Sequence, residues 1–139
     1  MYKYNARVIY DKERLGKLVC GNGIEMDFSA PPEFGGYTGF ATPEDLFAAS
    51  IATCLMLTFE TVCRKMNLSF ESFECKCDAH LEEIEGKEMM TTVIIKPIVV
   101  GENKEKLKRA LHLAEKYCLV TNSIKSRVIF EPEVRENIK

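Results

Sequence analysis

A long apolar segment in the first half of the chain constrains the fold more than any other feature. Thr42 can cap a helix, and Pro43 suits the first helical position. Glu44 and Asp45 follow, where acidic side chains favour the positive end of the helix dipole. The predicted helix runs to about Lys65 and is on the order of 34 Å long. Its middle is apolar nearly all round, which is typical of a helix buried on every side. One small domain can hardly cover it, so we expect a second copy of the chain, in a homodimer.

Length and charge exclude several classes of protein. The chain has 139 residues, which predicts a single domain over residues 1–139. With 19 basic and 21 acidic residues, it has no strong positive field for nucleic acid or an anionic membrane. We expect no secretory signal, and the stretch 46–59 looks too short and too rich in Ser and Thr to span a bilayer. These features predict a cytoplasmic protein, in which the six cysteines are reactive, ligating or buried rather than bridged.

The rest of the chain predicts an α+β fold with antiparallel sheet. Residues 21–23, Gly-Asn-Gly, form a strong turn signal, and Pro97 predicts an edge strand or a bulge. The predicted elements are strands at residues 4–10, 18–20 and 24–28, a helix at 43–65, strands at 68–81 and 91–100, a helix at 102–118 and a strand at 124–130.

Metal and hydrolytic chemistry are the first alternatives to consider. Cys75, Cys77 and His80 are close in sequence, but strand alternation places His80 on the opposite face from both cysteines. The Cys-X-Cys spacing also differs from that of zinc ribbons, so we expect no metal and no cofactor. No Gly-X-Ser-X-Gly occurs, and neither His80 nor His112 falls in a nucleophile pattern. A structural zinc protein remains the weakest alternative.

Thiol chemistry is the third alternative, and it depends on Cys54 and Cys118. Cys54 lies about eleven residues into the predicted helix, beyond the reach of its positive end. Burial alone would raise its pKa, so a reactive Cys54 needs a cation from elsewhere in the fold. Without that cation, Cys54 is a core residue. Cys118 ends the second helix, where the dipole opposes thiolate formation, so it suits resolving an oxidised partner better than attacking first.

A loop rich in glycine and proline precedes the long helix. Residues 31–40 contain three aromatic side chains, Phe34, Tyr37 and Phe40. The segment is either a flexible connector or a mobile apolar wall over a binding site, because binding residues favour such loops.

Four segments resemble one known family, the osmotically inducible and organic-hydroperoxide-resistance (OsmC/Ohr) proteins. The run Thr-Pro-Glu-Asp-Leu-Phe-Ala-Ala-Ser-Ile-Ala-Thr-Cys at residues 42–54 resembles the family's helix motif. The tract Cys-Leu-Val-Thr-Asn-Ser at 118–123 is similar to its second-cysteine motif, although Leu119 stands where proline is common. Tyr4-Asn5-Ala6 followed by Arg14-Leu15-Gly16 resembles the first hairpin, and Phe34-Gly35-Gly36 the Gly-rich loop.

The resemblance implies an OsmC-like fold: an intertwined homodimer in which antiparallel sheets enclose long central helices. It implies that Cys54 is the peroxidatic cysteine, that Cys118 resolves it, and that Glu44 is the active-site glutamate. Arg14, with Arg7 as a nearby alternative, falls where the thiolate-stabilising arginine lies. Glu44 and Cys54 are ten residues apart, about 15 Å along a straight helix. Either the helix is interrupted or Glu44 serves the site of a partner subunit.

The implied activity is a thiol-dependent peroxidase. It reduces organic hydroperoxides, with hydrogen peroxide as a further candidate, through a Cys54 sulfenate and a Cys54–Cys118 disulfide. A dithiol donor, dihydrolipoyl in some members, then restores both thiols. Phe34, Tyr37 and Phe40 offer an apolar wall for an alkyl peroxide. The alternative is a non-enzymatic thiol protein on the same scaffold that binds or senses.

Overall fold

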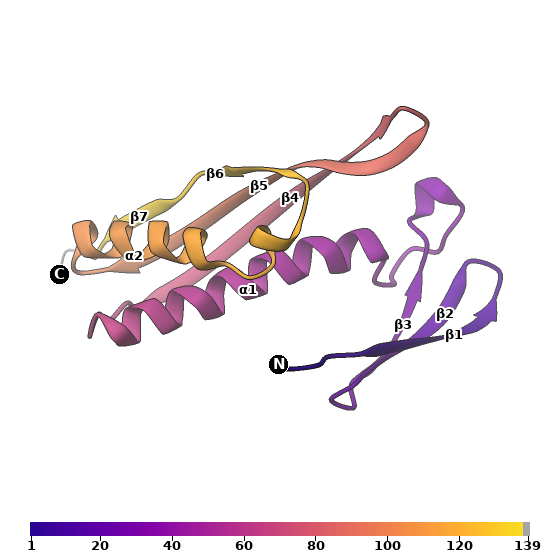
Figure 1. Ribbon diagram of the computed structural model, residues 1–139, viewed down its shortest axis with the longest axis horizontal. Helices are drawn as coiled ribbons and strands as arrows, with labels where there is room; N and C mark the ends of the chain where they lie inside the picture. Colours follow the sequence, from indigo (N-terminus) through magenta and orange to yellow (C-terminus); the bar gives the residue numbers. More distant parts are fainter. Residues whose placement is uncertain (138–139) are drawn as a thin grey trace. The chain divides into compact units, whose positions relative to one another are not determined.

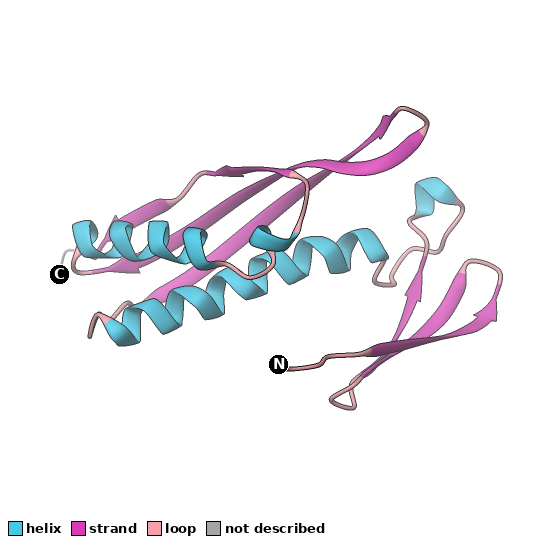
Figure 2. Ribbon diagram, viewed as in Figure 1, coloured by secondary structure: helices cyan, strands magenta, loops and turns pink. Residues whose placement is uncertain are grey.

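A computed structural model of the chain describes residues 1–137 and divides into two compact units, Met1–Phe47 and Ala48–Lys139. Two sheets, two α-helices and two short 3₁₀ helices make up the secondary structure of the described residues (Figure 2). The α+β class predicted from the sequence is therefore confirmed.

The first unit is built on a three-stranded antiparallel meander. Its strands are β1 (Ala6–Lys12), β2 (Leu15–Cys20) and β3 (Glu25–Ser29), in that spatial order. The predicted Gly-Asn-Gly turn joins β2 to β3, and Gly23 has φ +100°, a conformation that glycine adopts without strain. A short 3₁₀ helix, η1 (Pro32–Phe34), follows β3.

The second unit contains a four-stranded sheet around one long central strand, β5 (Lys87–Gly101). Strand β4 (Ser72–Ile84) forms an antiparallel hairpin with β5, while β6 (Arg127–Phe130) and β7 (Glu133–Glu136) both pair with its other side (Figure 1). We expected antiparallel pairing throughout, but β6 and β7 run parallel to β5. The reason is the intervening helix α2 (Lys104–Tyr117), which returns the chain to the start of β5.

Pro97 also differs from expectation, because it lies in a central strand with no break in its pairing with β4. It is fully buried and pairs with Cys75. On the other side of β5, β6 pairs only as far as Ile95 and β7 begins at Ile98. The residue without an N–H therefore lies in the gap between two short neighbouring strands.

The predicted long helix is confirmed as α1, Pro43–Lys65. Thr42 caps it: the Thr42 hydroxyl accepts a hydrogen bond from the Asp45 N–H at 3.0 Å and donates one to the Asp45 carboxylate at 2.8 Å. Within this chain, one stripe of α1 is buried, and burial of the remaining surface by a second copy stays a prediction. That buried stripe consists of Ile51, Leu55, Phe59 and Cys63.

The remaining surface of α1 is unusually apolar. An 18-residue window has a mean hydropathy of 1.8 and only 22% of it is buried, so the helix is long and apolar enough to cross a membrane. We expected the stretch 46–59 to be too short for that, but the helix extends beyond it at both ends. A core helix meets the same criteria of length and composition, so one such helix is weak support for a membrane span.

Both helices of the second unit pack on the same face of the sheet. Phe59 of α1 contacts Phe73 of β4, with ring centroids 5.2 Å apart, and Phe73 pairs with Val99 of β5. Gly101 has the same strand parity as Val99, and a Cβ there would lie 2.6 Å from Leu107 of α2. Besides the buried stripe, the core contains Val93, Ile95 and Val99 of β5 and Leu107, Ala110, Leu111 and Ala114 of α2.

Candidate functional site

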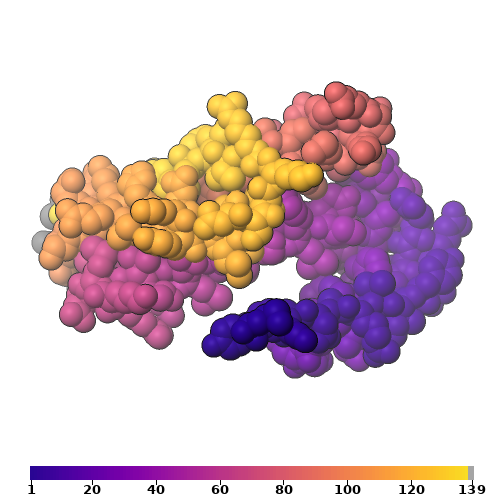
Figure 3. Space-filling model, in the orientation of Figure 1, coloured from indigo at the N-terminus to yellow at the C-terminus, as the bar shows by residue number. Residues whose placement is uncertain are grey.

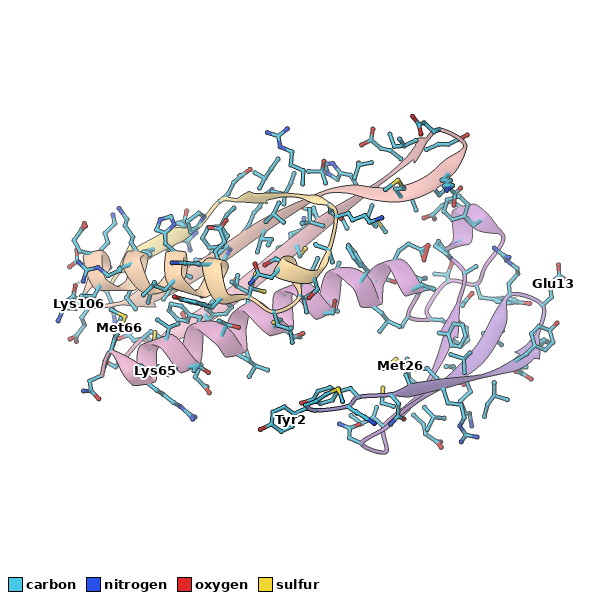
Figure 4. All side chains as sticks on the ribbon, in the orientation of Figure 1. Tyr2, Glu13, Met26, Lys65, Met66 and Lys106 are labelled. Atoms are coloured by element: carbon cyan, nitrogen blue, oxygen red, sulfur yellow. The ribbon has the colours of Figure 1, made fainter. Side chains whose placement is uncertain are left out.

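A groove in the second unit runs between one edge of α1 and the segment that follows α2. Its volume is about 710 Å³. Figure 3 shows the atoms of α2 and of the chain that follows it packed directly against those of α1. Figure 4 shows Lys65 at the C-terminal end of α1, and Lys65 is the single charged residue of the lining among the described residues. The groove is lined by Ser50, Thr53, Cys54, Leu57, Thr58, Thr61, Lys65, Tyr117, Leu119 and Val120.

Cys54 lies in the wall of this groove and is half-buried, as a free thiol. Thr58, one turn later on the same helix, has its hydroxyl oxygen 4.0 Å from the Cys54 sulfur. That hydroxyl also donates to the Cys54 carbonyl oxygen at 2.8 Å. The i, i+4 spacing that brings these two side chains together is visible in the sequence, although we did not identify Thr58 from it.

Cys118 lies directly after α2 and is completely buried, with 0% exposure. Burial raises the pKa of the Cys118 thiol, hydrogen bonds from the backbone N–H and hydroxyl of Thr121 lower it, and the adjacent Cys54 sulfur raises it. The two thiols are therefore close enough to interact, and the net effect on Cys118 is a raised pKa. The structure brings together the two cysteines singled out in the sequence, and both are free thiols.

The segment after Cys118 holds this residue in place. The Asn122 N–H donates to the Cys118 carbonyl at 3.1 Å, and the Thr121 hydroxyl donates to the same oxygen at 3.2 Å. A short 3₁₀ helix, η2 (Thr121–Ser123), results from this arrangement. Leu119 is 70% exposed and lines the groove, so the absence of proline there leaves the turn intact.

Arg14 lies in the turn between β1 and β2 of the first unit. Its φ of 65° is left-handed, which is uncommon for a residue other than glycine, and its guanidinium donates to the Phe34 carbonyl at 2.7 Å. Arg14 is the single charged residue, among the residues described, in the mainly apolar lining of a cavity of about 410 Å³ in this unit. Cys54 belongs to the second unit, so the contact of Arg14 with the thiolate stays a prediction.

The three aromatic residues of the loop form a partly exposed surface beside Arg14. The rings of Tyr37 and Phe40 meet edge to face at 6.3 Å, and the Tyr37 N–H donates to the Ser29 hydroxyl at 2.8 Å. Gly36 approaches the Ala30 carbonyl so closely that a Cβ would lie 1.6 Å from its oxygen. The loop is thus held by specific contacts within its own unit, and its role as a peroxide-binding wall stays a prediction.

Glu44 lies in the first turn of α1. Its Oε1 atom is buried and has no hydrogen-bond partner among residues 1–137. The Arg14 guanidinium donates to the Phe34 carbonyl, and no ion pair with Glu44 is found among residues 1–137. Because α1 is uninterrupted, Glu44 and Cys54 cannot meet along one helix. The alternative that Glu44 serves the site of a partner subunit stays a prediction.

Cys75 and Cys77, for which we expected no metal site, are half-buried on the helix-facing side of β4, while His80 is exposed. Burial raises the pKa of each thiol to about 11. In the part of the chain that the structure describes, His, Cys, Asp and Glu form no group of three or more that could hold a metal ion.

Comparisons with known proteins agree with this architecture. A model of the family described as OsmC-like protein matches residues 36–133. An OsmC-like protein of unknown function from Vibrio cholerae is similar with a TM-score of 0.86 and 25% identity, covering 95% of this chain and 99% of that one.

Two other solved structures show the same fold. An organic hydroperoxide resistance protein from Legionella pneumophila has a TM-score of 0.79 and 24% identity over 96% of this chain and 97% of its own. One from Bacillus subtilis has a TM-score of 0.72 and 20% identity over 96% and 98%. No curated protein matches the sequence. Because the family model covers more than half of the chain, and the motifs and fold agree with it, the chain belongs to the OsmC-like protein family.

Proposed function

We propose that the protein is a cysteine-based peroxidase that reduces organic hydroperoxides, with Cys54 as the peroxidatic and Cys118 as the resolving cysteine. The observation that carries this proposal is that Cys54 lies in the wall of a groove and that the buried Cys118 thiol is close enough to interact with it. The names of the Legionella and Bacillus structures support the substrate class, since both are organic hydroperoxide resistance proteins.

The first step oxidises Cys54 and reduces the peroxide. The Cys54 thiolate attacks the distal oxygen of the hydroperoxide, the O–O bond breaks, and the alkoxide takes up a proton to leave as an alcohol. Cys54 is then a sulfenic acid. In the second step, the Cys118 sulfur attacks the Cys54 sulfur, and hydroxide leaves with the Cys118 proton as water. An external dithiol reduces the resulting disulfide and restores both thiols.

The proposed division of labour agrees with the surroundings of the two sulfurs. Cys118 is buried with a raised pKa, so it is a poor first attacker. It nevertheless lies beside the Cys54 sulfur. In the attack on a Cys54 sulfenic acid, this proximity compensates for the low intrinsic reactivity of Cys118. Arg14 is the proposed cation that keeps Cys54 as thiolate. Phe34, Tyr37 and Phe40 are the proposed wall for the alkyl group.

We also propose a homodimer, for which two features of the single chain provide support. Outside its buried stripe, α1 presents Met56 and Leu57, which are 41% and 56% exposed, on a helix of high mean hydropathy; Leu57 also lines the groove. Glu44 has a buried oxygen without a donor, which a cation from a second copy would satisfy. Glu44 then completes the site of the partner subunit by orienting the arginine.

Turnover measurements on two variants test the mechanism. Cys54→Ser removes the nucleophile and should lower steady-state reduction of cumene hydroperoxide by at least about 10³-fold. Without reductant, Cys118→Ser should release one alcohol per chain and then stop, with a sulfenic acid at Cys54 that dimedone traps. The steady-state assay supplies dihydrolipoamide in excess and measures the loss of hydroperoxide.

Cys20→Ser is the matched control, because Cys20 is also half-buried but lies on β2 of the other unit. It should keep the wild-type rate. Full activity of Cys54→Ser would refute the assignment. Oxidation of wild-type protein without repeated turnover in excess dithiol would instead identify a non-enzymatic thiol sensor.

A further inference from the structure

A third thiol lies on the sheet face that carries the Cys54–Cys118 pair. Phe73 of β4 contacts Phe59 of α1 across this face, with centroids 5.2 Å apart. Cys75 has the same strand parity as Phe73, and the intervening Glu74 and the following Lys76 are exposed. The Cys75 side chain therefore points toward the helices.

Distances along the elements place Cys75 level with Cys54. The chain returns from α1 to β4 through a short connection, so the two run in opposite directions. From Phe73, two strand residues cover about 6.6 Å and reach Cys75. From Phe59, five helical residues in the matching direction cover about 7.5 Å and reach Cys54. Both thiols thus lie at nearly the same height along the sheet.

Counting the rise per residue along α2 places Cys118 at the same position along the sheet as Cys54 and Cys75. Leu107 of α2 lies over Gly101 of β5, and α2 runs back along that strand. Eleven helical residues from Leu107 to Cys118 cover about 16 Å, which equals about five strand residues back from Gly101. That position is next to Pro97, the pairing partner of Cys75.

The electrostatics of these thiols agree with the placement. Burial raises the pKa of Cys75 to about 11, and the neighbouring sulfurs of Cys77 and Cys118 add to the rise. Cys118 in turn interacts with Cys54. Cys118 therefore has a thiol neighbour on α1 and another on β4.

We propose that Cys75 is a third redox-active thiol, which exchanges with the Cys54–Cys118 disulfide to form a Cys75–Cys118 disulfide. The proposal rests on the proposed function, because that function supplies the first disulfide. The Cys75 thiolate attacks the Cys118 sulfur, the Cys54–Cys118 bond breaks, and Cys54 leaves as a thiolate. The proton released by Cys75 balances the one that Cys54 takes up, so no further oxidant or reductant is needed.

The exchange would change what the oxidised protein can do. Cys54 becomes free to reduce a second hydroperoxide while the chain still holds one disulfide. Without external reductant, wild-type protein should therefore consume two hydroperoxides per chain, whereas Cys75→Ser should consume one. Because only the thiolate attacks, the exchange rate should rise about tenfold per pH unit between pH 7 and 9.

Peptide mapping after rapid oxidation tests the exchange directly. The reduced protein is oxidised with one equivalent per chain of cumene hydroperoxide or, separately, of diamide, and is quenched at intervals with acid and N-ethylmaleimide. Trypsin separates the relevant thiols, because Lys76 lies between Cys75 and Cys77 and residues 117–125 contain only Cys118. A parallel digest with a protease that cleaves on the C-terminal side of glutamate isolates Cys54 in the peptide of residues 45–60.

The expected result is a Cys54–Cys118 link that declines as a Cys75–Cys118 link grows and as Cys54 becomes alkylated again. Cys75→Ser and Cys75→Ala should both abolish the second link and keep the first. Cys77→Ser is the matched control, on the same strand face, and should exchange as wild type does. Because wild-type kinetics alone reveal the exchange, a variant that folds poorly does not prevent the test.

Two outcomes overturn the exchange and leave the proposed function standing: a Cys54–Cys118 link that persists unchanged, or a second link that also forms in Cys75→Ser. If diamide produces the exchange but cumene hydroperoxide produces no Cys54–Cys118 link, the peroxidase proposal fails and the exchange stands.

Discussion

Two cysteines on one helix, Cys54 and Cys63, differ in almost every property that matters for reactivity. Cys63 lies on the buried stripe of α1, is 2% exposed, and has a pKa raised by burial to about 11. Cys54, nine residues earlier, lies half-buried in the wall of a groove beside a second thiol. The helix supplies both positions, so the neighbours on other elements decide which thiol takes part in chemistry.

The helical period explains how one element produces both environments. Ile51, Leu55, Phe59 and Cys63 recur every four residues and face the sheet as one stripe. Cys54 is rotated by about 100° from Leu55, which moves it from the stripe to the edge of the helix. The stripe therefore holds the core, and the edge faces the segment that carries Cys118.

The largest expected effect on stability comes from the centre of the buried stripe. Phe59 is fully buried and contacts the rings of Phe70 and Phe73, with centroids at 5.0 and 5.2 Å. Phe59→Ala should lower the free energy of unfolding by about 3–5 kcal/mol, because it leaves a cavity among these rings. Urea unfolding measures this loss. Thr61→Ala, on the exposed groove edge, should change stability by less than about 0.5 kcal/mol. Equal effects would contradict the division into stripe and edge.

The next effect concerns pH and Cys63. Folded Cys63 keeps its proton up to a pKa of about 11, whereas the unfolded thiol titrates at its ordinary pKa of 9.0. Keeping Cys63 protonated therefore adds its full contribution to the free energy of unfolding below pH 9. That contribution is lost as the pH rises through 11. The loss should be on the order of 2–3 kcal/mol for this residue. Unfolding of wild type and Cys63→Ala across this range measures it, and the variant should show a shallower decline. If stability fell with pH equally in wild type and Cys63→Ala, Cys63 would not be the cause of the decline.

The smallest effect concerns the surface of α1 outside its buried stripe. Leu57 is 56% exposed, so a charge there should leave the fold of one chain intact. In the proposed homodimer, Leu57→Lys should weaken association at least about tenfold, or about 1.4 kcal/mol, by placing a charge in an apolar contact. Sedimentation at several protein concentrations measures the dissociation constant, with Lys104→Ala as a surface control. A wild-type monomer at all concentrations would refute the dimer.

Local sequence rules predicted the elements whose signals are short in range. The predicted and observed bounds of α1 agree at both ends, because Thr42 and Asp45 form a cap and the apolar run is continuous. The turn at residues 21–23 is also where the sequence places it, between β2 and β3, and Gly23 has a positive φ. By contrast, β7 was not predicted, because four residues with two glutamates have no apolar alternation. Its pairing with β5 depends on partners distant in the sequence.

From sequence alone we predicted α1 with Cys54 near its middle, the position of Cys118 at the end of the second helix, and the family resemblance. These follow from caps, periodicity and motifs, which act over a few residues. The folded arrangement decides which sulfurs are neighbours: Cys118 interacts with Cys54 and with Cys75, while Cys63 is buried on the stripe of α1. The physical reason is that thiol contacts depend on how two helices pack on one sheet face. That packing joins residues more than forty positions apart.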